Sequence, residues 1–136
     1  MAITLCRCFY FNAAHRLFNP KWDSEKNFEV FGKCSNPNFH GHNYDLIIKI
    51  SGEINPDTGF VFNIEELKKI VDREIIEKLD HKNLNVDVEE FKDKIPSVEN
   101  IAIYIWNTLS PFISENKKLS LVLYETPRNF VEYCGN

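Results

Sequence analysis

The chain has 136 residues and a mass of 16.0 kDa, so we expect one domain over residues 1–136 with a single hydrophobic core. Its formal net charge of −4, without any run of basic residues, argues against a nucleic-acid partner and against a membrane surface. No apolar run could span a membrane, no secretory leader is apparent and the four cysteines form no disulfide framework, so we expect a reduced, cytoplasmic protein.

The first half of the chain predicts two long strands. Alternating apolar residues predict a strand over Ile3–His15, and the polar residues 17–38 predict a loop that carries a turn or two. A second strand is expected over Asn43–Ile50, where apolar side chains again alternate. The Pro- and Gly-containing run 55–59 predicts a turn, and residues 60–62 are expected to form a further short strand.

Two helices are expected next. Asn63 is a good N-cap for a helix that ends near Leu79, because apolar residues recur there at helical spacing. Residues 80–85 then read as a polar loop. A second helix is predicted from an N-cap at Ser97 to Leu109, where Ser-Pro interrupts the pattern.

The C-terminal residues predict two more strands, at 119–125 and 129–133, joined by a turn at 126–128. The order is therefore β-β-α-α-β-β. Sequential antiparallel hairpins with helices packed on one face of the sheet make an α+β domain.

Cys6 and Cys8 are two residues apart in the first strand, so their thiols point to one face. They could form a metal-binding pair, but no second cysteine pair completes such a site. We expect them to be small buried hydrophobic residues instead.

The pair His40-Gly41-His42 contains two of the four histidines of the chain. On a strand, residues two apart share a face, so both imidazoles can point at one place. His15 ends the first strand and is the only histidine before them. Three histidines with an open fourth position are typical of a catalytic zinc, whereas the competing interpretation is a set of polar residues bonded to water at the strand ends. We favour the zinc site.

Five motifs follow one another along the chain: Phe11-x-Ala13-Ala14-His15, Cys34-x₅-His40-Gly41-His42-Asn43-Tyr44, Leu79-Asp80-His81-Lys82-Asn83-Leu84, Ser97-x-Glu99-Asn100 and Tyr124-Glu125-Thr126. In this order and with this spacing they resemble the 6-pyruvoyl-tetrahydropterin synthase family. The resemblance covers nearly the whole chain. It implies the tunnelling fold, a four-stranded antiparallel sheet with two helices on one face, and a homohexamer of two stacked trimers with active sites between subunits.

The resemblance also implies a role for each site residue. The metal ligands are His15, His40 and His42, holding one Zn²⁺ per subunit, and Mg²⁺ is expected to accompany the triphosphate of the substrate. The implied base is Cys34, the implied proton relay from a neighbouring subunit is Asp80 with His81, and the implied pterin contacts are Glu125 and Glu99.

Each of these residues also has a structural interpretation. Cys34 could be a core cysteine, and His81 could simply interact with the dipole at a helix C-terminus. A first-turn glutamate such as Glu99 is often only a dipole partner, and Glu125 could lie in water at the rim of the sheet. Two departures from the family pattern, Val98 for threonine and Phe39 for a small residue, affect the rim of the expected pocket.

The implied activity is that of a zinc-dependent lyase. It would convert 7,8-dihydroneopterin triphosphate to 6-pyruvoyl-tetrahydropterin with loss of triphosphate, in tetrahydrobiopterin-type biosynthesis. A first alternative is the related 6-carboxytetrahydropterin synthase of the deazapurine (queuosine) route, or an enzyme with both activities. The five residues between Cys34 and His40 favour the pyruvoyl branch over the shorter gap of that relative. A second alternative is a zinc-binding assembly protein without catalysis, for which the set of polar site residues would have no use.

Overall fold

Two thirteen-residue strands, β1 (Ile3–His15) and β2 (His40–Gly52), form the centre of the molecule in a computed structural model that describes residues 2–136. They run antiparallel along their whole length, from the pair Ile3 and Gly52 to the pair His15 and His40. This register follows from the alternation of apolar side chains, because a slip by one residue would turn each buried side chain to the other face. It also places the three expected metal ligands at one end of the strand pair.

The rest of the sheet is added on both sides of this pair. β4 (Lys118–Tyr124) pairs antiparallel with β2, and β5 (Phe130–Tyr133) pairs antiparallel with β4. The two-residue strand β3 (Lys82–Asn83) pairs parallel with the end of β1, giving the order β3-β1-β2-β4-β5. The expectation of four antiparallel strands was therefore short by one, because residues expected to form a polar loop make this brief parallel contact.

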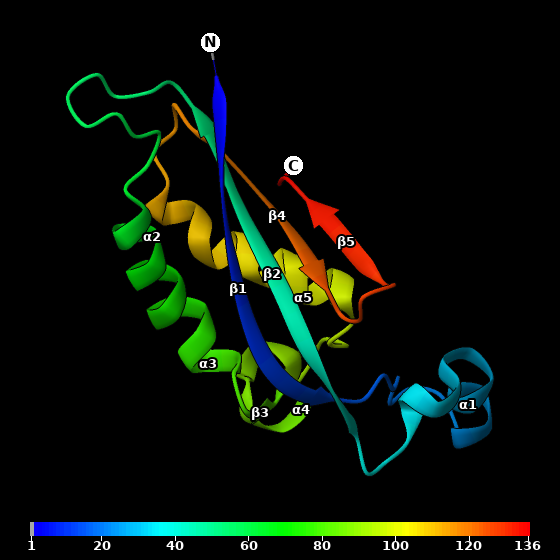
Figure 1. Ribbon diagram of the computed structural model, residues 1–136. Helices are drawn as coiled ribbons and strands as arrows, with labels where there is room; N and C mark the ends of the chain where they lie inside the picture. Colours follow the sequence, from blue (N-terminus) through cyan, green and yellow to red (C-terminus); the bar gives the residue numbers. More distant parts are fainter. Residues whose placement is uncertain (1) are drawn as a thin grey trace.

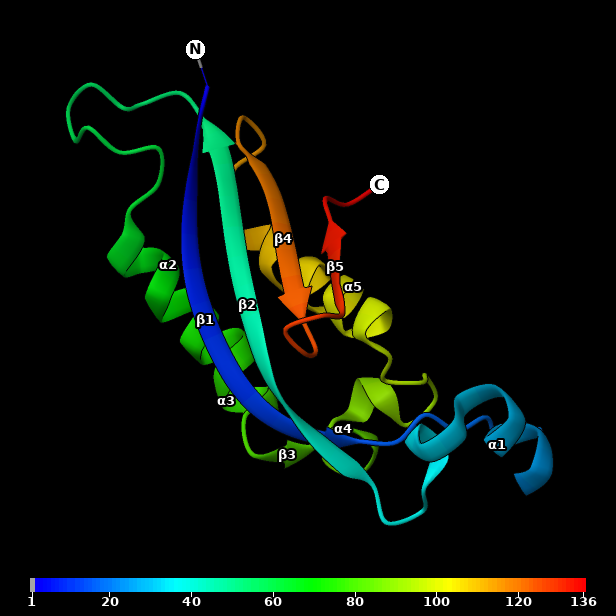
Figure 2. The same ribbon diagram turned by 45° about the vertical axis from the view of Figure 1, so that its right-hand side comes forward.

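Helices cover one face of the sheet, and the other face is open (Figures 1 and 2). The first helical segment comprises α2 (Ile64–Val71), a π-helical turn (Asp72–Ile76) and α3 (Glu77–Leu79). The second is α5 (Val98–Leu109), followed by a 3-10 turn (Ser110–Phe112). Both predicted N-caps are confirmed: the side chains of Asn63 and Ser97 accept hydrogen bonds from backbone amides of the first turn.

Shorter helices lie near the end of the sheet that carries the histidines. They are α1 (Ser24–Phe31), a 3-10 turn (Gly32–Ser35), α4 (Leu84–Asp87) and a further 3-10 turn (Glu89–Phe91). Helix α1 projects from the end where β1 stops and β2 begins (Figures 1 and 2). The segment expected to be mostly loop thus contains a capped helix, in which the Asp23 side chain accepts from the Lys26 amide.

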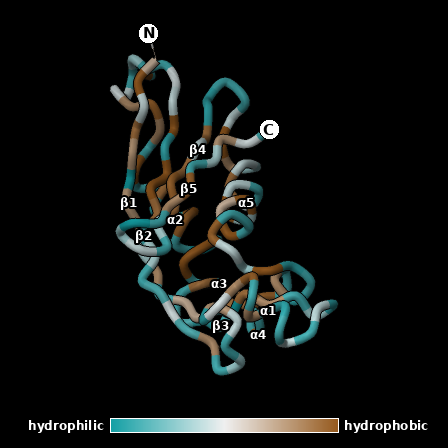
Figure 3. Tube along the Cα trace, turned by 90° about the vertical axis from the view of Figure 1, so that its right-hand side faces the viewer, coloured by the Kyte–Doolittle hydropathy of each residue, from teal (hydrophilic) through white to brown (hydrophobic). Residues whose placement is uncertain are grey.

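The core lies between the sheet and the helices. Residues of β1 and β2 alternate between buried and exposed, and at the centre the rings of Phe11 and Tyr44 stack 4.8 Å apart. Figure 3 shows hydrophobic and hydrophilic residues alternating along the strands, whereas the loop before β4 is hydrophilic. No helix among residues 2–136 is long and apolar enough to cross a membrane.

Two further expectations were wrong. Residues 60–62 are bends outside the sheet, although Val61 is buried. Cys6 and Cys8 are exposed, because they lie on the face of β1 that no helix covers. The alternation correctly placed both thiols on one face, but burial of that face needs a second layer, which this chain does not supply.

Candidate metal centre and active site

Three imidazoles meet where β1 ends and β2 begins. His15 is the last residue of β1, and His40 and His42 are the first and third residues of β2. One ring nitrogen from each lies within 4.8 Å of the others, and the ring centroids are 4.6 to 5.1 Å apart. The predicted convergence of the three histidines is confirmed, and it follows directly from the cross-strand register and the two-residue period.

The ring of His15 is held in a defined orientation. Its Nδ1 lies 2.7 Å from the carbonyl oxygen of Pro96, which can only accept, so Nδ1 carries the proton and Nε2 keeps its lone pair. The Tyr44 hydroxyl lies 3.4 Å from the same Nδ1. A hydrogen bond from the second ring nitrogen to a backbone carbonyl is the usual support of a metal-binding histidine.

The electrostatics of the cluster suit a cation. Burial lowers the pKa of His15 to about 4, although the hydrogen bond to the Pro96 carbonyl acts to raise it. The pKa of His40 is also lowered, first by burial and then by the charge of His42. These shifts favour the neutral rings of His15 and His40 near pH 7, which is the state that binds metals. Four buried ring nitrogens, His15 Nε2, both of His40 and His42 Nε2, have no hydrogen-bond partner among residues 2–136.

A metal ion would satisfy these nitrogens. Buried polar atoms without partners are costly, and a three-histidine set suits zinc with a fourth position left open for water or substrate. The residues present thus fit the group that the sequence predicts.

Cys34 lies in the 3-10 turn that leads toward β2 and is partly exposed. The Leu17 amide donates to the Cys34 carbonyl at 2.8 Å, and the Arg16 guanidinium donates to the Ser35 carbonyl at 2.7 and 3.1 Å. These bonds attach the turn to the residues that directly follow His15. Cys34 is therefore not a core cysteine, and its backbone lies beside the end of β1 that carries His15.

Asn85 supports the same segment from the other side. Its side-chain oxygen accepts from the Arg16 amide at 2.8 Å, and its side-chain amide donates to the Arg16 carbonyl at 3.1 Å. This pair of bonds fixes the backbone immediately after His15. Sequence reasoning missed Asn85; the polar run that follows Asp80 and His81 was its only signal.

Glu125 lies much closer to the histidines than its position in the sequence indicates. It follows β4, and its Oε2 is 3.9 Å from His15 Nε2, with the side chain 19% exposed. After burial, the charge of Glu125 is the second cause of the raised pKa of Tyr44. The carboxylate therefore lies beside the histidine cluster and is largely shielded from water.

Asp80 and His81 lie at the outer edge of β1, where they bond to the Asn12 backbone and border the open face of the sheet. The Asp80 carboxylate accepts from the Asn12 amide at 2.8 Å and lies 3.0 Å from His81 Nδ1, while the His81 amide donates to the Asn12 carbonyl at 2.6 Å. The hydrogen bond from the Asn12 amide is the largest cause that holds the pKa of Asp80 below its usual value. Burial opposes it, and His81 lowers the pKa further. The His81 side chain is 83% exposed.

This pair borders a hollow of about 660 Å³ on the open face. Apart from the buried Phe11, the strand residues that line it lie on the face away from the helices, whereas His15 and His42 lie on the helix side. Within one chain, Asp80 and His81 therefore do not join the histidine cluster. The lining residues are Tyr10, Phe11, Asn12, Asn43, Asp45, Asp80 and His81.

Glu99 occupies the first turn of α5 and is exposed. Among residues 2–136, no hydrogen bond or ion pair joins it to the cluster. Its turn is nevertheless linked to the site, because Asn100 Nδ2 donates to the Ile95 carbonyl at 2.8 Å, beside the Pro96 carbonyl that orients His15. Asn100 and Pro96 were both missed as supports, although Asn100 belongs to one of the recognised motifs.

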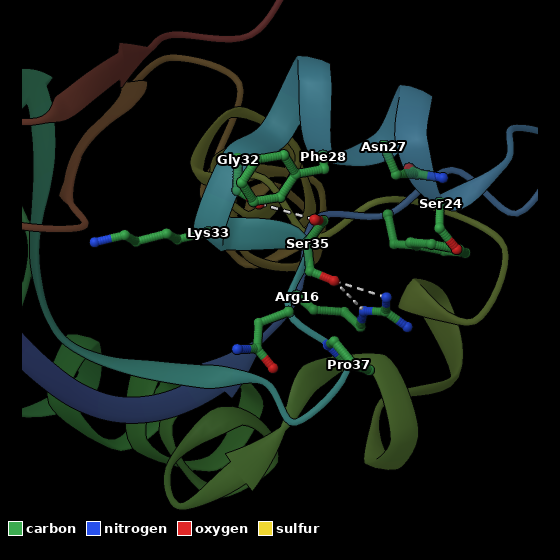
Figure 4. A pocket seen from close by; sticks show the side chains of 10 residues that line it. Arg16, Ser24, Asn27, Phe28, Gly32, Lys33, Ser35 and Pro37 are labelled. Atoms are coloured by element: carbon green, nitrogen blue, oxygen red, sulfur yellow. Dashed lines mark hydrogen bonds between the residues drawn. The ribbon is translucent and has the colours of Figure 1, made fainter.

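A second hollow of about 600 Å³ lies next to the Cys34 turn (Figure 4). Arg16 lines this hollow, and its guanidinium donates to the Ser35 carbonyl. The same guanidinium lies 4.0 Å from the centre of the Phe18 ring. Lys33 points away from Arg16 in this view. The guanidinium is thus engaged in holding the turn.

Comparisons with known proteins agree with this arrangement. The family model described as 6-pyruvoyl tetrahydropterin synthase matches residues 4–136. The chain belongs to the 6-pyruvoyl tetrahydropterin synthase family. The predicted membership is therefore confirmed over almost the whole sequence.

Named relatives and a solved structure support the same assignment. The 6-pyruvoyl tetrahydrobiopterin synthase of Homo sapiens is 44% identical over 125 residues, which cover 92% of this chain and 86% of the relative. The 6-carboxy-5,6,7,8-tetrahydropterin synthase of Haemophilus influenzae is 30% identical and covers 75% of this chain and 84% of the relative. The structure of Caenorhabditis elegans 6-pyruvoyl tetrahydropterin synthase covers all of this chain and 97% of its own, with a TM-score of 0.93 and 38% identity. The predicted tunnelling fold is confirmed.

Proposed function

We propose that this chain is a zinc-dependent lyase that converts 7,8-dihydroneopterin triphosphate to 6-pyruvoyl-tetrahydropterin, with loss of triphosphate. The observation that carries the proposal is the three-histidine cluster, whose buried ring nitrogens lack partners, next to the Glu125 carboxylate and the Cys34 turn. Membership of the family adds the substrate class. The reaction belongs to tetrahydrobiopterin-type biosynthesis.

The cluster would hold one Zn²⁺ per subunit through His15, His40 and His42. When bound, the ion supplies a Lewis acid for the hydroxyl groups of the substrate side chain and so acidifies the neighbouring C–H bonds. The chain's own contribution begins with orientation, because Pro96 holds His15 with Nε2 facing the cluster. Mg²⁺ is proposed to accompany the triphosphate.

Cys34 is proposed as the base. Its thiol would take a proton from a side-chain carbon of the substrate, and a nearby cation favours the thiolate that can do so. The partial exposure of Cys34 and the attachment of its turn to Arg16 and Leu17 support this role. A scaffold protein would need neither feature.

Glu125 is proposed to bind the pterin ring. A carboxylate can accept two N–H bonds from an aminopyrimidine, and such charge-assisted pairs are about twice as strong as neutral hydrogen bonds. Glu99, exposed at the start of α5, is proposed as a second contact.

Asp80 and His81 are proposed to serve as a proton relay for the site of a neighbouring subunit. Support comes from their place on the open face, opposite to the histidine side chains, so that they can meet a cluster only from another copy. The outer edge of β1 from Ile3 to Phe11, which pairs with no other strand among the described residues, offers a place for another chain to pair. We propose a hexamer built from two trimers, in the reducing cytoplasm, where four free thiols remain stable.

The first alternative activity is 6-carboxytetrahydropterin synthesis, since the relative from Haemophilus influenzae shares the family. The five residues between Cys34 and His40 favour the pyruvoyl product. The deciding experiment incubates purified zinc-loaded protein with 7,8-dihydroneopterin triphosphate and Mg²⁺ and identifies the products by mass spectrometry. Formation of 6-pyruvoyl-tetrahydropterin with release of triphosphate supports the proposal, and 6-carboxytetrahydropterin as the main product would contradict it. No turnover by zinc-loaded protein would favour the assembly role.

A further inference from the structure

The proposed reaction leaves one pair of reactive side chains unused, the thiols of Cys6 and Cys8. Both are exposed and free, and both lie on the open face of β1. Arg7 between them belongs to the other face, where its guanidinium lies 5.8 Å from the centre of the Phe9 ring. The two thiols are therefore neighbours with no side chain of their own strand between them.

Strand geometry prevents these two cysteines from forming a disulfide with each other. Residues two apart on a strand are separated by about 6.6 Å, and their Cβ atoms project in parallel. A disulfide needs Cβ atoms about 3.5 to 4.5 Å apart. Closing that bond would require β1 to buckle, against its pairing with β2 along the whole strand.

A metal ion can bridge the same gap. Two metal–sulfur bonds of about 2.3 Å place the sulfurs up to about 4.6 Å apart, which Cβ atoms about 6.6 Å apart allow if each sulfur leans inward by about 1 Å. Two thiolates in a line suit soft ions with two-fold coordination. Soft sulfur ligands favour Cu(I) and Zn²⁺, and of these Zn²⁺ almost always takes four ligands, which leaves Cu(I) as the ion that fits. The spacing thus suits a bridging soft ion and excludes a disulfide.

The partner strand adds a charge of the right sign. Lys49 lies directly across from Cys6 and Ile47 directly across from Cys8, and opposite residues of an antiparallel pair share a face. A Cu(I) ion with two thiolates has a net charge of −1, which the Lys49 ammonium offsets. Ile47 is the apolar cross-strand neighbour of Cys8.

We propose that Cys6 and Cys8 form a two-thiolate site for a soft monovalent ion of the Cu(I) type, distinct from the histidine cluster. Binding replaces two S–H bonds by two S–Cu bonds and releases two protons to solvent, with no change in oxidation state. The His15, His40 and His42 cluster faces the helices, whereas the thiol pair lies on the open face, so the two sites are on opposite sides of the sheet.

The test titrates fully reduced, zinc-loaded protein with Cu(I) in the presence of bicinchoninate, a coloured competing chelator. The wild-type protein is expected to remove one more Cu(I) per chain from the chelator than either Cys6→Ser or Cys8→Ser. Cys134→Ser is the matched control, because Cys134 is exposed but has no second cysteine beside it, and it should bind as the wild type does. Native mass spectrometry should show one additional copper per chain with the mass expected for Cu(I).

Three results would overturn the proposal: equal copper binding by wild type and Cys6→Ser, loss on only one of the two substitutions, or an equal loss in Cys134→Ser. Because both positions are exposed, serine should preserve the fold, which circular dichroism checks. Cys6→Ser and Cys8→Ser should also leave turnover of the pterin substrate unchanged. Failure of copper binding is thus separate from failure of the proposed lyase activity.

Discussion

The role of Glu125 gives the sharpest test of the proposed active site. The substitution Glu125→Gln keeps the size of the side chain and one acceptor, but it removes the charge and presents N–H donors to the donors of the pterin. Its oxygen is 3.9 Å from His15 Nε2, and the side chain is 19% exposed, so water replaces its hydrogen bonds only in part. Losing a charge-assisted bidentate contact should cost about 2–4 kcal/mol, or roughly thirty- to a thousandfold in kcat/KM.

The assay measures kcat/KM for 7,8-dihydroneopterin triphosphate together with the zinc content of the same sample. The zinc content should stay near one per chain, because the three histidine nitrogens converge without Glu125. Glu115→Gln is the control, since Glu115 is an exposed carboxylate in the loop before β4, and it should leave kcat/KM unchanged. A near-normal kcat/KM for Glu125→Gln would refute the pterin contact. Loss of zinc from Glu125→Gln would show instead that Glu125, which lies close to His15, helps to hold the metal.

The remaining predictions concern the metal, the subunit contact and the backbone before the histidine pair. His42→Ala should lose both zinc and activity, whereas Cys34→Ala should keep about one zinc per chain and lose activity by orders of magnitude. Elemental analysis measures the zinc, and an equal loss of zinc in both variants would mean that the Cys34 thiol is a metal ligand. Mixed and refolded Cys34→Ala and His81→Ala subunits should regain activity, because hybrid oligomers contain intact sites; inactive hybrids of normal size would place every group in one chain. Phe39 has φ 67°, a left-handed conformation that costs a residue with a side chain about 1–2 kcal/mol, so Phe39→Gly should be more stable than Phe39→Ala by about 1 kcal/mol in urea unfolding. Equal stabilities would mean that the turn relaxes when the ring is removed.

Local features of the sequence were sufficient for the long strands, the two main helices and the convergence of the three histidines. A strand repeats every two residues and a helix every 3.6, so the alternation along β1 and β2 and the caps Asn63 and Ser97 can be recognised from neighbours in the chain. His40 and His42 share a face for the same reason. These features depend on covalent geometry and on side-chain types a few residues apart, and the structure agrees with them.

Contacts between distant segments could not be obtained in this way. The Pro96 carbonyl that orients His15 is 81 residues away, and Asn85 and Glu125 reach the same strand end from other elements. None of these contacts produces a repeating pattern in the sequence, because each depends on how the helices and β4 pack against the sheet. Their presence follows only from the assembled core.

The two faces of the sheet show this division most clearly. Alternation determined that Cys6 and Cys8 point to one side of β1 and His15 to the other, but it did not determine which side is covered. The helices pack on the histidine side, so burial lowers the pKa of His15, while the thiols stay exposed and Asp80 with His81 borders the open face. The side to which a residue points is a local property of the strand. Whether that side is dry, and which groups share it, is decided by the packing of segments far apart in the chain.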